Sequence, residues 1–457
     1  MLETFRNIFR IPELRKRIFF TLLFIFIYRI GGHIPTPGID PSVLREFYEQ
    51  SRNTLFGLYD MFVGGAFQRA TVFALGIMPY ISASIIIQLL ATVFPYFHKL
   101  QREGAEGRKK ITQYTRYGTV LLALIQSMGI SIFLQSITSP STGVSAVLPS
   151  MIGIKFTLVT IISMTTGTVF IMWLGEQITN RGIGNGISFI IFVGIVADFP
   201  TAVISEAQQV IAGARHPFIE VVIVAVVLAM TAFIVMMTQA TRRIPIQTPK
   251  KVIGTKMYQG QNTVLPLRLN MAGVIPIIFA SSVMYAPMML KSFLPESPVI
   301  EEITRWFQPG EPVYSVIYAL LIVFFCYFYT AIIFNPLDIA ENLKRSGGFI
   351  PGIRPGKKTA EFLDQVLTRI TLPGSVFLAF IAVAPFFLMK MLKISFFFGG
   401  TSVLIVVGVA LDTLQQLESH LQTRNYEGFM KKGRLAAVGT RSSAGLPAGA
   451  EVQGREK

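Results

Sequence analysis

The chain has 457 residues, of which 52% are hydrophobic and 14% are charged. Because about a quarter of the residues in an ordinary soluble domain carry charge, this composition excludes that class and indicates an all-α, polytopic membrane protein. Lysine and arginine number 41 against 25 aspartates and glutamates, a net charge of +16 that becomes informative once it is located along the chain.

The first predicted element is an apolar span at residues 18–34. Arg15-Lys16-Arg17 precedes the apolar run from Ile18 to Tyr28, as in a signal peptide. No small-residue cleavage site follows, since the run ends in Arg29-Ile30-Gly31-Gly32. We therefore expect an uncleaved first span whose N-terminus lies in the cytoplasm.

The next stretch, 58–95, divides into a first part that is only half apolar and a second part that is apolar. Residues 72–94 are apolar and long enough to span a bilayer, which takes about 20 residues. Residues 60–71 carry Asp60, Gln68, Arg69 and Gly64-Gly65, and are too short and too polar to span. This first part suits a re-entrant segment in a protein-lined cavity, where irregular backbone at membrane depth is tolerated. An amphipathic turn on the membrane surface explains the pattern equally well.

Ten apolar spans are predicted in all: 18–34, 72–95, 118–138, 154–174, 183–200, 217–239, 271–293, 313–334, 370–389 and 396–417. The segments that join them alternate in charge. One set, which includes both chain ends, holds 31 of the 41 lysines and arginines, and the other set holds 8. The positive-inside rule assigns the basic set to the cytoplasm, so both termini are expected there.

Two of the basic loops, 240–270 and 335–369, are long and polar, with turns such as Ile244-Pro245 and Pro351-Gly352. Loops of this length are more often functional than passive. Their charge would also set topology and attract anionic lipid, although neither effect requires such length. The segment after residue 433 is rich in Gly, Ala and Ser, and we expect it to be disordered.

The span centres are nearly free of ionisable residues, which pumps and ion-coupled carriers usually place at mid-membrane. Glu220 and Asp412 lie near span ends, and the polar groups within spans are amides such as Gln88 and Gln126. The four histidines lack the spacing of metal ligands, and no nucleophile–base pair appears. We expect neither an enzyme nor a metal or cofactor site.

Isoleucine pairs recur at helical spacing. Ile77 and Ile81 share one helix face, and so do Ile187 and Ile191. Isoleucine in a membrane helix usually faces lipid, so spacing alone favours that location. Pro79 and Pro276 should kink spans two and seven, at similar places in the two halves of the chain. That similarity suggests a duplicated, inverted architecture.

Six long segments are distinctive: GGAFQRATVFALGIMPYISASIIIQLL, EGRKKITQYTRYGT, NRGIGNGISFIIF, LNMAGVIPIIFASS, GGFIPGIRPG and FGGTSVLIVV. In this order they resemble the signatures of the SecY family, the central subunit of the bacterial Sec protein-conducting channel. The resemblance runs from the N-terminus to about Lys432.

The resemblance implies a channel that translocates unfolded preproteins across the bacterial inner membrane and releases membrane-protein segments laterally into it. Ten transmembrane helices would form two pseudo-symmetric five-helix halves, 1–200 and 201–417, around a central pore. A cytoplasmic tail, 418–457, would follow. No catalytic residue is implied.

The resemblance also assigns site residues. The plug, about residues 60–71, would include Asp60, Met61, Phe62, Val63, Gly64, Gly65, Phe67 and Arg69, and its glycines and charges suggest a displaceable, loosely packed segment. The pore ring would comprise Ile77, Ile81, Ile187, Ile191, Ile278 and Ile405. A lateral gate in spans two, three, seven and eight would place Gln88 and Asn270 at its seam, bonded across it or within their own halves. Tyr285-Ala286 stands where apolar bulk is expected at that gate.

The implied partners are SecE, SecG, the SecA ATPase, the ribosome, signal sequences with their nascent or preprotein chains, and the lipid bilayer. Arg242, Arg243 and Arg354 in the two basic loops would dock SecA or the ribosome. The alternative is an inverted-repeat secondary transporter, which would need a polar mid-membrane site. A basic scaffold that docks ribosomes without a pore would explain the loops but not the plug.

Overall fold

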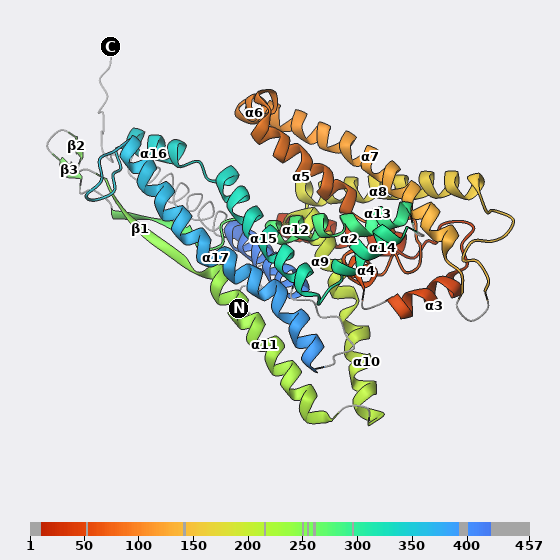
Figure 1. Ribbon diagram of the computed structural model, residues 1–457. Helices are drawn as coiled ribbons and strands as arrows, with labels where there is room; N and C mark the ends of the chain where they lie inside the picture. The colour runs from red at the N-terminus through yellow and green to blue at the C-terminus, as the bar shows by residue number, and fades with distance from the viewer. Residues whose placement is uncertain are drawn as a thin grey trace, which may run out of the picture.

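The computed structural model describes residues 11–51, 54–139, 143–213, 216–248, 251–253, 256–258, 262–294, 297–392 and 401–421. The tail after residue 433, expected to be disordered, lies outside the described residues. Within them the chain is mostly helical (Figure 1).

The helices in chain order are α2 (Pro12–Gly31), α3 (Pro41–Ser51), α4 (Leu55–Val63), α5 (Met78–Val93), α6 (Pro95–Arg102), α7 (Ala105–Ser136), α8 (Ile154–Arg181), α9 (Gly186–Ala197), α10 (Phe199–Ile211), α11 (Pro217–Gln239), α12 (Ile275–Met284), α13 (Ala286–Phe293), α14 (Pro298–Trp306), α15 (Pro312–Ile333), α16 (Pro336–Arg345) and α17 (Lys357–Leu392). A further helix, Thr401–Leu421, is called the terminal helix below. Many of these helices begin at proline, because the first turn leaves its N–H groups unbonded and proline has none to lose.

Eight helical stretches among the described residues are long and apolar enough to cross a membrane, or nine if α5 and α6, bent by 103° at Phe94, form one broken span. The predicted first span corresponds to α2, which is 20 residues long and is not among these eight stretches. Arg15-Lys16-Arg17 and Arg29 lie at its two ends and lower its apolar character. The ten predicted spans are consistent with these helices.

Pro79 and Pro276 do not kink their helices as expected. Each lies in the first turn of its helix, so α5 and α12 begin there and the chain before them is non-helical. The residues before the two helices, Ile77 and Val274, have nearly the same backbone angles, φ near −90° and ψ of −1° and −8°. This likeness of α5 and α12 fits a duplicated architecture.

The two long basic loops fold together instead of forming separate polar loops. Strands β1 (Thr241–Gln247) and β4 (Asn262–Arg268) form an antiparallel ribbon, with the short pair β2 (Lys251–Ile253) and β3 (Lys256–Tyr258) between them in sequence. Gln247 in β1 and Phe349 in the second loop exchange two backbone hydrogen bonds of 2.9 Å. We call residues 241–268 and 335–370 the basic body; in Figure 1 the ribbon and α16 lie at one end of the molecule.

The basic body has its own small hydrophobic core, built mainly from Ile244, Leu267, Ile350, Leu363 and Leu367. The main core is a separate cluster that runs through α4, α5, α9, α12, α15, α17 and the terminal helix. In contrast, α10 and α11 form a hairpin that projects from the helix bundle (Figure 1). The predicted boundary between halves, near residue 200, falls at the start of this hairpin.

Candidate functional site

The predicted re-entrant segment is a short buried helix followed by turns. The helix α4 begins at Leu55, five residues before the expected start, and every residue in it except Met61 is buried. It ends at Gly64, which adopts the left-handed conformation (φ 73°, ψ 40°) that glycine tolerates without strain. Residues 64–71 continue as turns, in which Phe67 is buried and Arg69 is exposed. This burial is incompatible with a turn lying on the membrane surface.

Polar groups fix the turns against α4. Asp60 Oδ1 accepts hydrogen bonds from the backbone N–H groups of Phe67 and Gln68, both at 2.9 Å. The Tyr59 hydroxyl donates to the carbonyl oxygen of Leu75 at 3.0 Å. Burial raises the pKa of the Asp60 carboxyl to about 6, while the hydrogen bond from the Gln68 amide opposes that shift. The segment is therefore a folded unit and not the loosely packed one that its glycines and charges suggested.

The same helix contacts elements from both halves of the chain. Gly64 lies so close to α9 that a Cβ on it would be 2.8 Å from the Cα of Gly194. The rings of Tyr59 and Phe62 meet Tyr285 edge-on, with centroids 5.5 and 5.9 Å apart. Ser402 Oγ of the terminal helix lies 3.3 Å from Met61 Sδ. Since Tyr285 occupies the break between α12 and α13, α4 is a contact point for several helices that lie far apart in sequence.

The six predicted ring isoleucines come from four elements of the main core. Ile77 and Ile81 lie at the start of α5, Ile278 lies in α12 and Ile405 in the terminal helix. These four and Ile191 of α9 are buried, and Ile187 of α9 is half-buried against the same cluster. Their burial against protein argues against lipid-facing positions. That they form one ring stays a prediction.

A single side-chain hydrogen bond joins α5 to α12: Ser82 Oγ and Ser282 Oγ lie 2.9 Å apart. The predicted gate amides lie elsewhere. Gln88 Nε2 donates to Ser84 Oγ of its own helix at 2.9 Å, and Asn270 Nδ2 donates to the Gly273 carbonyl at 3.0 Å. Each of these donors is thus bonded within its own half, and the serine pair, which the sequence analysis missed, connects the two helices.

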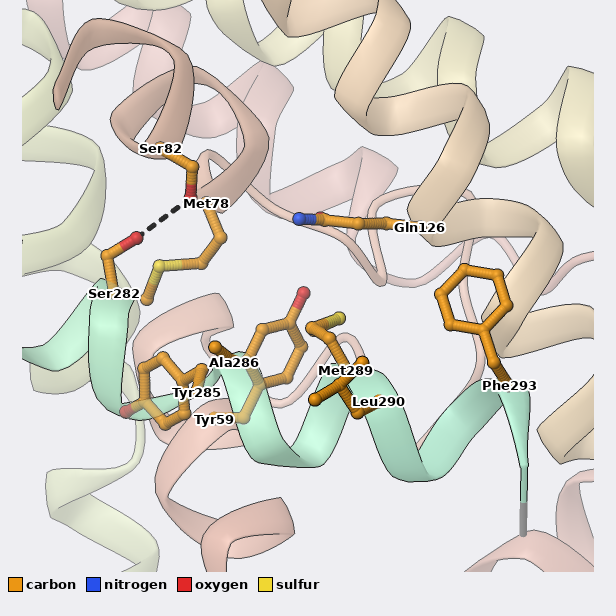
Figure 2. A pocket seen from close by; sticks show the side chains of 10 residues that line it. All are labelled: Tyr59, Met78, Ser82, Gln126, Ser282, Tyr285, Ala286, Met289, Leu290 and Phe293. Atoms are coloured by element: carbon orange, nitrogen blue, oxygen red, sulfur yellow. Dashed lines mark hydrogen bonds between the residues drawn. The ribbon is translucent and has the colours of Figure 1, made fainter. Parts of the chain in front are cut away.

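A cavity of about 320 Å³ lies beside this serine pair, between α4, α5, α7, α12 and α13 (Figure 2). On its far side Gly129 of α7 packs so closely that a Cβ there would be 2.9 Å from the Phe293 ring of α13. The wall of the cavity is mostly apolar, with a few hydroxyl, thioether and amide groups. Such a wall suits an apolar chain segment. The lining residues are Tyr59, Met78, Ser82, Gln126, Ser282, Tyr285, Ala286, Met289, Leu290 and Phe293.

The three predicted docking arginines are exposed on the basic body. Arg242 and Arg243 lie on β1, where the next residue, Ile244, points into the small core. Arg354 lies in the Pro-Gly turn before α17, and its carbonyl accepts a 3.0 Å hydrogen bond from the Thr359 hydroxyl. An exposed guanidinium group is a planar fork of N–H donors that can bind a carboxylate or a phosphate. Among the described residues, no group of three or more His, Cys, Asp or Glu side chains is placed to hold a metal ion.

Sequence comparison gives long matches to one family. The SecY family model matches residues 71–414. The protein translocase subunit SecY of Escherichia coli (strain K12) is 46% identical over 430 residues, which cover 93% of this chain and 96% of that protein. The protein of the same name from Streptomyces galbus is 48% identical over 444 residues, covering 94% and 100%.

Solved structures share the fold. A structure of a protein-conducting channel aligns with a TM-score of 0.65 at 18% identity, covering 89% of this chain and 92% of that one. Two others align with a TM-score of 0.62 at 17% identity and the same coverage. One concerns the plug domain of SecY, described as stabilising the closed state of the translocation channel. The other is Sec61 in a canine ribosome–channel complex from the endoplasmic reticulum.

Proposed function

The chain belongs to the SecY family and is a protein-conducting channel of the bacterial inner membrane, and we propose that α4 is the plug that closes it at rest. It is a multi-pass protein and not an enzyme. One observation carries the proposal. The short helix α4 is almost wholly buried, and it touches Gly194 of α9, Tyr285 between α12 and α13, and Ser402 of the terminal helix. A helix in that position would block a path between the two halves.

The second seal is the proposed pore ring of Ile77, Ile81, Ile187, Ile191, Ile278 and Ile405. Branched aliphatic side chains offer water no hydrogen-bond partner, so a narrow collar of them dewets and resists ions. The same flexible side chains can close around an extended polypeptide during its passage. The burial of five of these residues in the core that also holds α4 supports this role.

The seam between α5 and α7 on one side and α12 and α13 on the other would be the lateral gate. Separating the Ser82–Ser282 pair breaks one neutral hydrogen bond, a net loss of about 0.5–1.5 kcal/mol. A membrane segment would leave through the open seam because each leucine-like residue favours lipid by about 0.3–0.6 kcal/mol, whereas a central charge opposes it by about 2.5 kcal/mol or more. The cavity beside the serine pair supplies an apolar site at which a signal sequence would begin to separate the helices.

The basic body would lie in the cytoplasm with both chain termini, as the charge alternation predicts. Arg242, Arg243 and Arg354 would dock the SecA ATPase or the ribosome, and the solved Sec61 channel bound to a ribosome supports the second partner. SecE and SecG are the further subunits that family membership suggests. Nascent chains and preproteins, led by their signal sequences, are the cargo, and the halves 1–200 and 201–417 would move apart as units.

A reversible crosslink tests the gate. The variant Ser82→Cys/Ser282→Cys joins α5 to α12 when oxidised, and Cys326, the one native cysteine, is buried. Preprotein transport into vesicles should stop on oxidation and resume on reduction. The matched control is Ser127→Cys/Thr165→Cys, because those hydroxyls lie 3.4 Å apart but join α7 to α8 within one half. Transport that persists through the oxidised α5–α12 crosslink would contradict the gate.

A further inference from the structure

The C-terminal end of α4 is completed by a different helix. The last four carbonyls of a helix lack partners within it. In α4 the carbonyl of Asp60 accepts from Gly65 at 3.0 Å, and that of Met61 accepts from Gly64 at 3.2 Å. The Val63 carbonyl instead accepts the hydroxyl of Tyr28 at 3.1 Å, and the Gly64 carbonyl accepts Arg29 Nη1, also at 3.1 Å. Both donors belong to the last turn of α2.

Arg29 lies where the charge alternation disfavours a cation. It is half-buried at the end of α2 opposite the basic N-terminal turn, on the side that the positive-inside rule leaves poor in lysine and arginine. The carbonyl end of α4 carries partial negative charge, which stabilises a cation placed against it. We call Gly64-Gly65, where the chain turns at the end of α4, the elbow. Asp198 adds a carboxylate beside it, since a Cβ on Gly65 would lie 3.7 Å from the Asp198 Oδ1 atom. These contacts stabilise the Arg29 cation at this position.

The hydrogen bonds of α4 and its contacts to the second half differ in kind. The hydrogen bonds run to Tyr28, Arg29 and Leu75 of the first half. The second half offers T-shaped ring contacts with Tyr285 and a hydroxyl–thioether contact at Met61, which are weaker. When the halves separate, the contacts to the second half should therefore break first.

We propose that Tyr28 and Arg29 are positioning residues that clasp the elbow of α4 and hold the resting plug on the first half of the channel. This inference rests on the proposed role of α4 as the plug. Gly194 of α9 presses on the same elbow, so α2 and α9 together fix one end of the helix. Displacement of the plug then requires the clasp to open, and residues that make no contact with the pore set how often a resting channel leaks.

The test is ion conductance of purified, resting channels in planar bilayers. Arg29→Gln removes a charged hydrogen bond and should raise the conducting fraction about tenfold, because such bonds exceed neutral ones in strength. Tyr28→Phe deletes one oxygen atom and should give a smaller rise, and Arg29→Lys should fall between wild type and Arg29→Gln. Arg305→Gln on α14 makes the same charge change at an exposed site outside the plug and gate, and should change nothing.

A second set of variants separates this inference from the plug proposal. In one, a four-glycine linker replaces Leu55–Gly65; in the other, Arg29→Gln is added to that replacement. If the clasp acts through the plug, Arg29→Gln adds no conductance once α4 is gone. If the linker channel does not leak, the plug proposal fails. If it leaks while Arg29→Gln and Tyr28→Phe stay silent, or if Arg29→Gln leaks further without α4, the clasp is wrong.

Discussion

The proposed plug, α4, and the basic body are built in opposite ways. In α4, the proposed plug, every residue except Met61 is buried. Its polar side chains and the carbonyls at its C-terminal end form hydrogen bonds to the turns that follow it, to Leu75 and to the last turn of α2. In the basic body the arginines are exposed, and a small core beneath β1 keeps their backbone rigid. A seal must exclude water and still separate from one half of the channel, so apolar packing with few hydrogen bonds to that half suits it. A docking surface must bind from solution, so it keeps charge outside and order underneath.

This difference predicts that the two regions fail separately. Changes in the plug, the ring or the gate should alter ion leakage or signal selection and leave SecA-dependent energy coupling intact. Changes to the arginines should reduce coupled export and leave the resting channel closed. The predictions below run from the largest expected effect to the smallest.

The largest effect is expected for Arg354→Glu. Charge reversal on a rigid, exposed turn converts attraction to an acidic partner into repulsion and should lower SecA-dependent export in vesicles by at least about tenfold. Conductance at rest should not change. Lys344→Glu, the same reversal on the exposed face of α16, is the matched control and should have a smaller effect. Normal export by Arg354→Glu would contradict the proposal that Arg354 in the basic body docks SecA.

Gly64→Val attacks the plug from inside its elbow. A side chain at φ 73° is strained, and its Cβ would collide with the backbone of Gly194. The variant should displace α4 and leak ions steadily at rest, while SecA binding stays normal. Gly104→Val, also at positive φ (71°) but with open space around it, controls for backbone strain alone. Equal leakage from both variants would deny a special role to the elbow.

Ile278→Asn and Ile405→Asn should loosen the ring. An amide hydrates the constriction and weakens packing around α4, so preproteins with defective signal sequences should be exported several-fold better than by the wild type. Ile278→Val keeps the apolar surface and serves as the control. If the asparagine variants export defective substrates no better than the wild type, the ring does not contribute to signal selection.

The smallest effect is expected for Ser282→Ala at the gate. It removes one neutral hydrogen bond between α5 and α12, a net contribution of about 0.5–1.5 kcal/mol. The gate should open somewhat more readily, which shows as faster insertion of weakly hydrophobic signal sequences. Ser292→Ala on α13 removes a hydroxyl that bonds within its own helix, to the Met289 carbonyl, and controls for the loss of a serine.

Much of this organisation could be predicted from the sequence because it follows from local patterns. Hydropathy predicts the spans, and the glycines at positions 64 and 65 indicate an interruption of regular structure. Glycine also commonly caps the C-terminal end of a helix in the left-handed conformation, so Gly64 could have indicated that a helix ends there. The β-ribbon was missed even though Arg243-Ile244-Pro245-Ile246 alternates as a strand does. The polarity and length of loop 240–270 are typical of an irregular loop, and the alternation covers only a few residues.

Other parts of the site could not be predicted because they depend on tertiary distance. The clasp joins residues 35 apart in sequence, and the serine pair joins residues 200 apart. Gln88 looked available to bond across the seam, but Ser84 lies one helical turn away and offers its amide a nearer partner. The burial of α4 likewise depends on helices from both halves, which the sequence of residues 55–71 does not reveal.

The central claim is that the channel has two seals in series, and conductance across planar bilayers tests it most directly. Three channels are compared: one in which a glycine linker replaces Leu55–Gly65, one in which glycine replaces the six ring isoleucines, and one with both changes. The linker channel should flicker, because the ring still dewets intermittently. The double variant should conduct more, and more steadily, than the linker channel. If the double variant conducts no more than the linker channel alone, the isoleucines are not a seal and the account is wrong.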